Sequence, residues 1–437
     1  METVAKFRGN RLGNGAGRPR EPDRQQMKVL FTSPILEHPA AGGPQLRIEN
    51  SIKALSRICD LYIVSRAIAS DAQRLHTEDY FKPYCQEFTH LPRVTKDPAR
   101  NRLVRIASRL YQRAFDSNTP SDADFILQCL DRIRADAIWF GYGNISYGLM
   151  KRIRRLRPSL PMVCDTDSVW SRFVLRELPH TRGIRKIRIA RAGRRKEKEE
   201  REWTNFCTVT TAVSDVDAEY YRQLTADKQS VRVFRNVIDV DSYAVRPRVP
   251  AGFKSPCIYL AGTFGHFNSP MDSAARWVLD EVFPILLERI PTLHFYIVGN
   301  NSDRGFGHLN GPNITATGRL ESVLPYLVHA DVALVPLKFE SGTRFKILEA
   351  GACEIPLVST TLGAEGIPVV DGRHILIADD AKGFADSILR LIADKAFARD
   401  MAARCNELVR EGFSIDSLAR EGSEILAYIG GTRRLTS

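Results

Sequence analysis

The chain has 437 residues, which is enough for two or three domains that each bury a hydrophobic core. Its composition, 43% hydrophobic and 26% charged, is that of a globular protein and argues against disorder along the whole chain. The formal net charge of +12 suits a phosphorylated ligand, anionic lipid or nucleic acid, and does not choose among them.

The N-terminal residues 1–26 are rich in Gly, Arg and Pro and lack the apolar run of a secretory signal, so we expect a disordered basic tail. No stretch reaches the roughly 18 apolar residues that a membrane-spanning helix needs. The eight cysteines form no Cys-x-x-Cys pair, which favours buried free thiols over disulfides or a zinc site. These features predict a cytoplasmic protein, with peripheral contact to the inner membrane surface left open.

Short apolar runs that alternate with helical patterns begin at residue 28. Residues 28–32 predict a buried strand, which is followed by a Gly42-Gly43-Pro44 loop and a helix that starts near Gln45. Residues 61–65 predict the next strand, and this order of strand, helix and strand indicates a parallel sheet. Further strands of the same kind are expected at residues 137–140, 161–165 and 207–213.

A second series of buried strands occupies the C-terminal half of the chain. We therefore predict an α/β protein with two doubly wound, Rossmann-like domains that face a cleft. The second series is expected at residues 258–262, 293–299, 332–336 and 356–360. The predicted boundaries are 27–238 for the first domain, 239–256 for a proline-containing linker, 257–412 for the second domain, and 413–437 for a helix that returns to the first domain.

Residues 100–113 and 182–201 are strongly basic and helix-prone. Two interpretations stay open for both segments: solvated helices with a stripe that faces the core, or amphipathic surface helices that touch anionic lipid. Nucleic acid is the weakest candidate partner, because aromatic residues do not interleave with these charges and no nucleic-acid module is present.

The segment that follows the strand at residues 332–336 carries the strongest chemical signal. Gly342 permits a tight turn, and a helix that begins near Arg344 would direct free backbone N–H groups and a partial positive charge at a ligand. Arg344 and Lys346 oppose the helix dipole, so an anionic ligand would explain them. Glu349, one turn later, could accept hydrogen bonds from two vicinal ribose hydroxyls. The plain alternative is a surface helix with a Lys346–Glu349 ion pair.

This helix start and the residues after it resemble a known family. Residues 348–360 resemble the donor-site signature of retaining glycosyltransferases of the glycosyltransferase family 4 (glycosyl transferases group 1) type, which have the GT-B fold. The resemblance extends over nearly the whole chain from about residue 27, and it is specific in the C-terminal half. Further similarities lie at residues 42–43, 165–168, 234–239, 362–367 and 371–377.

The resemblance implies that residues 27–238 bind the acceptor and residues 257–412 bind the nucleotide sugar. It also implies roles for individual residues. Glu349 would bind the ribose, and Gly42 and Gly43 would lie near the donor phosphates or the acceptor. The family's second carboxylate falls on Ser341 here, so Glu340, one residue away, is the candidate for that role. The expected catalytic residues are Glu340, Arg344 and Lys346, the two cations replacing an Arg and a Lys that the family carries after the first C-domain strand. The expected donor-binding residues are Gly262, Thr263, Gly342, Thr343, Glu349, Gly363, Ala364 and Glu365.

The same resemblance implies transfer with retained anomeric configuration from a nucleotide sugar, UDP- or GDP-linked, to a glycan or lipid-linked acceptor. No cofactor and no metal are expected, because protein cations would stabilise the leaving diphosphate. The family's N-domain histidine is not evident near residues 141–144. His38 or His266 could approach the sugar, but a structural role is the favoured interpretation for each. Two alternatives stay open: another enzyme on this fold, such as a sugar-nucleotide epimerase or phosphorylase, and a non-catalytic nucleotide-sugar or polysaccharide-binding protein.

Overall fold

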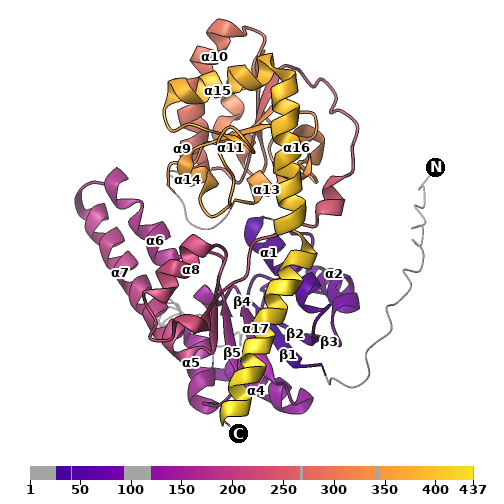
Figure 1. Ribbon diagram of the computed structural model, residues 1–437, viewed down its shortest axis with the longest axis vertical. Coiled ribbons are helices and arrows are strands. Elements are labelled where there is room, and N and C mark those ends of the chain that lie inside the picture. Colours follow the sequence, from indigo (N-terminus) through magenta and orange to yellow (C-terminus); the bar gives the residue numbers. More distant parts are fainter. Residues whose placement is uncertain (1–25, 41, 93–119, 266–268, 340–343, 437) are drawn as a thin grey trace, which may run out of the picture.

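The computed structural model describes residues 26–40, 42–92, 120–265, 269–339 and 344–436 (Figure 1). These residues form two α/β domains, one above the other in Figure 1, and each domain is built on its own sheet. The expected N-terminal tail up to residue 25 and the first basic segment, residues 100–113, lie outside the described residues.

The N-terminal domain contains a seven-stranded sheet in the order β3-β2-β1-β4-β5-β6-β7. All neighbouring strands in it are parallel, and the central ones are apolar on both faces because helices cover both sides. Its strands are β1 (Lys28–Ser33), β2 (Asp60–Ser65), β3 (Glu87–His90), β4 (Ala137–Gly141), β5 (Met162–Asp165), β6 (Val209–Ala212) and β7 (Val231–Val233). Its helices are α1 (Gly43–Leu55), α2 (Asp71–Phe81), α4 (Pro120–Ile133), α5 (Tyr147–Leu156), α6 (Trp170–Leu175), α7 (Gly183–Phe206) and α8 (Asp215–Arg222).

The C-terminal domain contains a six-stranded parallel sheet in the order β10-β9-β8-β11-β12-β13. Its strands are β8 (Cys257–Ala261), β9 (His294–Val298), β10 (Ile314–Ala316), β11 (Val332–Val335), β12 (Leu357–Ser359) and β13 (Leu376–Ile377). Its helices are α9 (Pro270–Trp277), α10 (Phe283–Arg289), α11 (Ser302–Phe306), α12 (Leu324–Leu327), α13 (Phe345–Ala352), α14 (Thr361–Ala364), α15 (Ala381–Ala393) and α16 (Lys395–Gly412).

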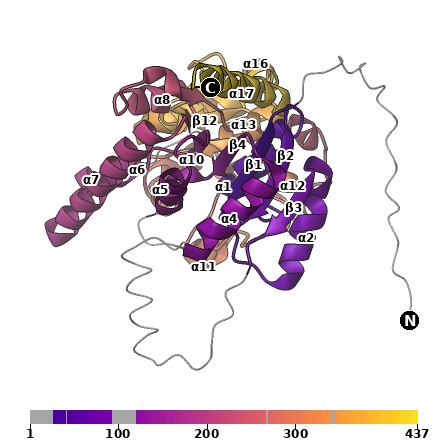
Figure 2. The same ribbon diagram turned by 90° about the horizontal axis from the view of Figure 1, so that it is seen from below.

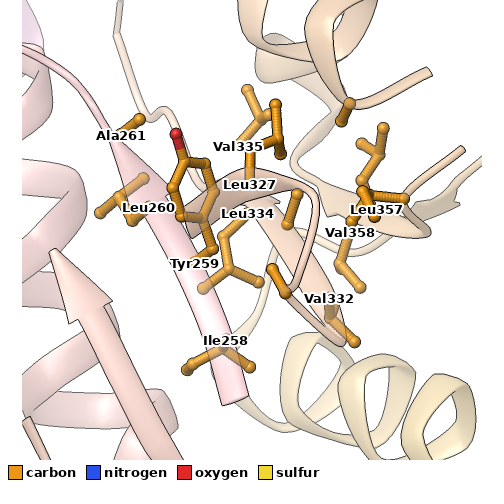
Figure 3. Close-up of a cluster of buried hydrophobic side chains, with 14 of the residues drawn as sticks. Ile258, Tyr259, Leu260, Ala261, Leu327, Val332, Leu334, Val335, Leu357 and Val358 are labelled. Carbon is orange, nitrogen blue, oxygen red and sulfur yellow. The ribbon is translucent and has the colours of Figure 1, made fainter. Parts of the chain in front are cut away.

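The core of the C-terminal domain lies along β8, β11 and β12. Ile258, Leu260 and Val332 are fully buried, and Val358 extends the same apolar layer onto β12 (Figure 3). Burying an aliphatic side chain of this size stabilises the fold by about 1.5–3 kcal/mol. This layer holds the strand ends, and therefore the loops after them, in fixed positions.

The last helix, α17 (Ile415–Thr436), leaves the C-terminal domain and packs on α1. Leu418 and Ile425 of α17 share one buried cluster with Ile48 and Ile52 of α1. Figure 1 shows α16 and α17 running one after the other along the same side of the two domains. The chain therefore crosses between the domains twice, once in the linker and once between these helices.

The predicted fold class, two doubly wound Rossmann-like domains, is confirmed. The central strands begin and end within two residues of their predicted positions, whereas β3, β7, β10 and β13 were not predicted. All eight cysteines are free thiols, and all but Cys85 are buried. Within the described ranges, no helix is long and apolar enough to cross a membrane.

Candidate functional site

The starts of α1 and α13 meet between the two sheets. Gly43, the first residue of α1, lies so close to α13 that a Cβ atom on it would be 3.2 Å from Cδ2 of Phe345. The glycine loop after β1 and the helix start after β11 therefore belong to one site, as expected where the carboxyl ends of parallel strands face each other. The absence of a side chain at Gly43 permits this approach.

A buried arginine holds α1 in place beneath its glycine start. Arg47 donates hydrogen bonds to Asn236 Oδ1 (2.8 Å) and to the Phe234 carbonyl (3.0 Å), and it forms an ion pair with Asp165 at the end of β5. Asn50 donates to the carbonyl of Val237 at 2.6 Å. Buried charges need such partners. The network fixes α1 against the central sheet and against the segment that enters the linker.

On the C-terminal side, two glycines permit close backbone contacts. Gly299 has φ +122°, and a Cβ there would be 2.2 Å from the carbonyl oxygen of Gly262, so the turns after β8 and β9 touch. A Cβ on Gly363 would be 2.4 Å from the carbonyl oxygen of Val335. Thr360 caps α14 by accepting a hydrogen bond from the Gly363 N–H at 3.0 Å. These contacts hold the turns after β8 and β9 together, and the loop after β12 against the end of β11.

Glu349 lies in α13 with a specific partner from the linker. The Tyr243 hydroxyl donates a hydrogen bond to Glu349 Oε1 at 3.0 Å. Burial raises the pKa of the Glu349 carboxyl, and Lys346 and the Tyr243 hydrogen bond oppose that shift. Burial also raises the pKa of Tyr243. The carboxylate is thus held in one orientation with acceptor capacity left for a ligand.

Arg344 and Lys346 flank the first turn of α13. Arg344 is the N-cap residue in extended conformation and is only 5% exposed, whereas Lys346 is half-buried. The helix therefore begins at Phe345, one residue after the predicted start. Arg344 and Lys346 bring positive charge to the helix end that already carries a partial positive charge.

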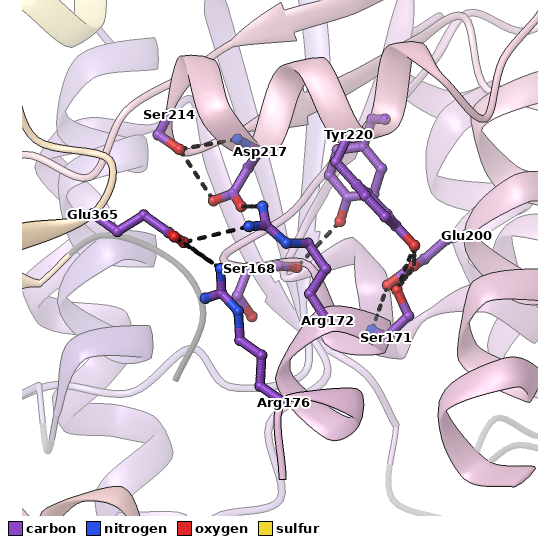
Figure 4. Close-up of polar contacts among 10 residues, drawn as sticks. Ser168, Ser171, Arg172, Arg176, Glu200, Ser214, Asp217, Tyr220 and Glu365 are labelled. Atoms are coloured by element: carbon purple, nitrogen blue, oxygen red, sulfur yellow. Dashed lines mark hydrogen bonds and ion pairs between the residues drawn. The ribbon is translucent and has the colours of Figure 1, made fainter. Parts of the chain in front are cut away.

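An ion-pair cluster joins the two domains beside this helix start (Figure 4). Glu365, directly after α14, accepts hydrogen bonds from Arg176 Nη2 at 2.8 Å to each carboxylate oxygen, and it lies 3.6 Å from Arg172 Nη2. Arg172 also donates to Asp217 Oδ1 at 3.3 Å. Burial raises the pKa of Asp217; Arg172 and, more weakly, Arg344 oppose that shift. The charges of the cluster and of the α13 start thus act on one another.

The acidic residues after β5 have structural partners. Asp165 binds Arg47 and accepts a hydrogen bond from Thr211 Oγ1 at 2.7 Å. Asp167 accepts hydrogen bonds from Asn144 Nδ2 at 2.6 Å and from Trp170 Nε1 at 3.4 Å. In the described ranges, no group of three or more His, Cys, Asp or Glu residues could hold a metal ion.

The structure places Gly42 and Gly43 at the start of α13. Gly262 and Thr263 follow β8 and Gly363 follows β12, the strands on either side of β11. Ala364 is buried, and Glu365 is engaged by Arg172 of α6 and by Arg176 directly after it. His38 stacks on Tyr80 with ring centroids 3.4 Å apart, and its Nδ1 lies 3.2 Å from Glu49, which are structural contacts. The predicted residues Glu340, Gly342 and Thr343, together with Ser341 and His266, lie outside the described residues.

Sequence reasoning missed Tyr243, Arg172, Arg176 and Asp217. None of them belongs to a local motif, and they come from three separate segments: the linker, α6 with the residue after it, and α8. A weak signal existed for Arg172 and Arg176, because both follow a central strand, at whose end ligands bind in this kind of fold.

Together, the two sheets and the site between them define the class of protein. The described residues superimpose on known two-domain glycosyltransferase structures, which confirms the GT-B fold. Sucrose-phosphate synthase from Thermosynechococcus elongatus matches with a TM-score of 0.67 and 15% identity over 93% of this chain and 100% of that one. A crystal structure of Anabaena HepE in complex with UDP and glucose matches with a TM-score of 0.59 and 14% identity over 92% and 99%.

Sequence comparison narrows this class for the C-terminal domain. Residues 259–394 match the family model described as glycosyl transferases group 1, so this chain carries such a domain. A lipopolysaccharide core biosynthesis glycosyltransferase, LpsE of Rhizobium meliloti (strain 1021), is 27% identical over 166 residues. That alignment covers 36% of this chain and 48% of LpsE, about half of the relative's length. The family model covers the C-terminal domain, from β8 to the end of α15.

Proposed function

We propose that this protein is a retaining, metal-independent glycosyltransferase. It transfers a sugar from a nucleoside-diphosphate sugar, UDP- or GDP-linked, to a glycan or lipid-linked acceptor. The observation that carries the proposal is the meeting of Gly43 with the start of α13, next to Arg344 and one turn before Glu349. Backbone N–H groups, two cations and the Glu349 carboxylate, which could accept hydrogen bonds from ribose hydroxyls, are thereby gathered between the two α/β domains.

The comparisons support this proposal over its alternatives. The group 1 domain covers α13 and the loop with Gly363. Anabaena HepE, which shares the fold, was solved with UDP and glucose. LpsE is described as acting in lipopolysaccharide core biosynthesis, which favours a glycan or lipid-linked acceptor here. An epimerase would use the same nucleotide sugar and is separated by its product. A phosphorylase would need inorganic phosphate in place of a nucleotide sugar, and a binding protein would bind without turnover.

The proposed mechanism is electrostatic. When the bond between sugar and diphosphate breaks, negative charge grows on the leaving nucleoside diphosphate. Arg344, Lys346 and the free N–H groups of the α13 start would stabilise that charge in a site from which the closed domains exclude water. Glu349, oriented by Tyr243, would hold the ribose. Removing one such contact typically raises the barrier by about 3 kcal/mol, roughly a hundredfold in rate.

The test begins with incubation of the protein with UDP- and GDP-sugars and a glycan or lipid acceptor. Release of nucleoside diphosphate together with a glycosylated product, unaffected by EDTA, supports the proposal. The anomeric configuration of the product is read by NMR. An isomerised nucleotide sugar would instead indicate an epimerase, and binding without turnover a binding protein.

Variants then assign the activity to this site. We expect Arg344→Ala and Glu349→Ala to lower the transfer rate by about a hundredfold. Arg399→Ala and Glu411→Ala, which change the same residue types on the exposed face of α16, are the matched controls. Wild-type donor binding and activity in both site variants would show that this helix does not serve the reaction.

We also propose peripheral contact with an anionic membrane at the inner membrane surface, through the N-terminal half of α7. This helix projects away from the body of the protein in both views (Figures 1 and 2). Every charged residue from 182 to 196 is Arg or Lys. Between these cations, Ile184 is 72% and Ile187 is 55% exposed. Exposed apolar residues among cations suit a headgroup region, where each cation adds about 1 kcal/mol of attraction.

Cosedimentation with vesicles tests this contact. The protein should bind vesicles that contain both phosphatidylglycerol and phosphatidylcholine, and it should not bind vesicles of phosphatidylcholine alone. We expect the double variant Ile184→Ser/Ile187→Ser to reduce binding, and Arg188→Gln/Arg191→Gln to reduce both the binding and its salt dependence. Arg152→Gln/Arg155→Gln on α5 is the control with an equal loss of charge. Equal binding to both kinds of vesicle, or no effect of either α7 variant, would refute the contact.

A further inference from the structure

The ion-pair cluster of Figure 4 lies where β5 and β6 of the N-terminal sheet and β12 of the C-terminal sheet end, and Arg344 lies at the end of β11 beside β12. Arg172 follows β5 and Asp217 follows β6, which are neighbours in the N-terminal sheet. Arg344 follows β11 and Glu365 follows β12, which are neighbours in the C-terminal sheet. In open α/β sheets, ligands bind at such strand ends. The cluster therefore occupies ligand-binding positions in both domains.

The contacts within the cluster resemble those of an occupied anion site. The Glu365 carboxylate contacts two guanidinium groups. It accepts two hydrogen bonds from Arg176 and lies within ion-pair distance of Arg172. The side chains of Arg172, Arg176 and Glu365 are 23%, 22% and 24% exposed, so a solute can reach them. Asp217, by contrast, is buried beneath Arg172 and is anchored by Ser214 Oγ at 3.2 Å. Glu365 is therefore the exchangeable partner and Asp217 the fixed one.

The charges favour replacement of Glu365 by a stronger anion. Ion pairs between partly exposed side chains typically contribute only about 0–1 kcal/mol. The Arg176–Glu365 pair therefore adds little to the stability of the contact between the domains. A phosphate group carries up to two charges and three acceptor oxygens, which match forked guanidinium groups better than a carboxylate does. The positive charge of Arg344 also acts on this cluster, as its influence on Asp217 shows.

The position of α6 is independently fixed. Glu200 of α7 is fully buried and accepts a hydrogen bond from the Ser171 N–H at 2.9 Å. Ser171 precedes Arg172 in α6, and its hydroxyl contacts the same carboxylate and the Tyr220 hydroxyl. Arg172 is thus presented by an anchored helix, and Arg176 follows directly at the C-terminal end of that helix.

We propose that Arg172 and Arg176 form a phosphate-binding site of the N-terminal domain, which Glu365 occupies while no phosphorylated ligand is bound. The site takes a phosphate monoester or diphosphate group opposite the start of α13. The inference rests on the proposed function for the source of that phosphate, which is either the nucleotide donor or a phosphorylated acceptor. It makes Glu365 a competitor of the ligand, which opposes the sequence-based expectation that Glu365 contacts the donor.

Calorimetric titration of the full chain tests the site with UDP, GDP, inorganic pyrophosphate and glucose 6-phosphate. We expect Arg176→Gln and Arg172→Gln to weaken binding roughly tenfold, the effect of losing one charge-assisted hydrogen bond. Glu365→Gln should tighten binding several-fold, because the competing charge is gone. Effects on UDP, GDP and pyrophosphate identify the donor as the source, and effects on glucose 6-phosphate alone identify the acceptor.

Controls separate binding from folding. Arg185→Gln and Glu177→Gln break an ion pair of 2.6 Å on the neighbouring helix segment and should leave all affinities unchanged. Arg176→Lys keeps the charge and should retain most of the affinity. Unchanged affinities in both arginine variants, or weaker nucleotide binding in Glu365→Gln, would overturn the inference while leaving the proposed function intact. Binding of pyrophosphate through these arginines without any nucleotide binding would instead refute the proposed function.

Discussion

Replacement of the buried Glu200 by Gln should change how the stability of the protein depends on pH. Burial raises the pKa of Glu200 from 4.5 to about 7, against the hydrogen bonds from Ser171 and Tyr220. The folded state therefore retains the proton more strongly than the unfolded state. This group contributes stability below about pH 4.5, and that contribution is lost as the pH rises through about 7.

The size of this pH effect on stability follows from the pKa shift of Glu200. This pKa difference between the unfolded and the folded state corresponds to a change of about 3 kcal/mol in the free energy of unfolding. About 2.5 kcal/mol of that change falls between about pH 5 and about pH 8. Gln has the same shape as Glu and can still accept the Ser171 N–H bond at 2.9 Å, but it does not titrate. The free energy of unfolding of Glu200→Gln relative to the wild type should therefore rise by about 2.5 kcal/mol over that range.

Calorimetric unfolding of both proteins at the two pH values measures this difference. Other carboxyls, such as Glu49 and Asp331, have lowered pKa values and act in the opposite direction, so only the comparison between variant and wild type isolates Glu200. Glu197→Gln on the same helix, at a half-buried position, is the control. A difference between Glu200→Gln and wild type that does not change with pH would refute the assigned shift.

Three further changes test the site and its support. Tyr243→Phe removes the hydrogen bond to Glu349 and should weaken nucleotide binding roughly tenfold in calorimetric titration. Gly363→Ala places a Cβ 2.4 Å from a backbone oxygen and should lower the unfolding free energy by about 1–3 kcal/mol, measured by urea denaturation. Arg47→Met or Asp165→Asn alone should each destabilise the N-terminal domain by about 3–5 kcal/mol, and the double variant by less than the sum.

Each of these predictions has a contrary outcome. Nucleotide affinity in Tyr243→Phe equal to wild type would mean that Glu349 needs no partner. Gly431→Ala, where a Cβ meets nothing within 4 Å, is the control for Gly363→Ala, and equal effects of the two would contradict the steric argument. Additive losses in the Arg47 and Asp165 variants would show that these side chains stabilise the fold independently.

The sequence by itself determined the fold class and the central strands. In β1, β4, β8 and β11 both faces of the strand are buried, so the sequence is a continuous apolar run that can be recognised. The helix start at Arg344 was also readable, because a strand, a glycine, cations and a carboxylate follow one another within a few residues. Features of this kind can be predicted because they depend on residues that are close together in the sequence.

Only the tertiary structure revealed the sheet edges. The unpredicted strands β3, β7, β10 and β13 are the four edge strands of the two sheets. They have two to four residues, and β3 is only half-buried along its whole length. An edge strand has a neighbour on one side only, so its residues need not be apolar on both faces. Such a segment becomes a strand because it pairs with the neighbouring strand, and its own sequence carries no clear strand pattern.

The same distinction applies to the site. The glycine loop and the α13 start are local features, and their residues could be named from the sequence. Their contact, Gly43 against Phe345, joins residues far apart in the chain and depends on how the domains pack. Tyr243 reaches Glu349 from the linker, and Arg172 and Arg176 reach Glu365 from the other domain. Hydrogen-bond and ion-pair partners need only be close in space, and their spacing along the sequence does not reveal this. These pairs could therefore be identified only from the tertiary structure.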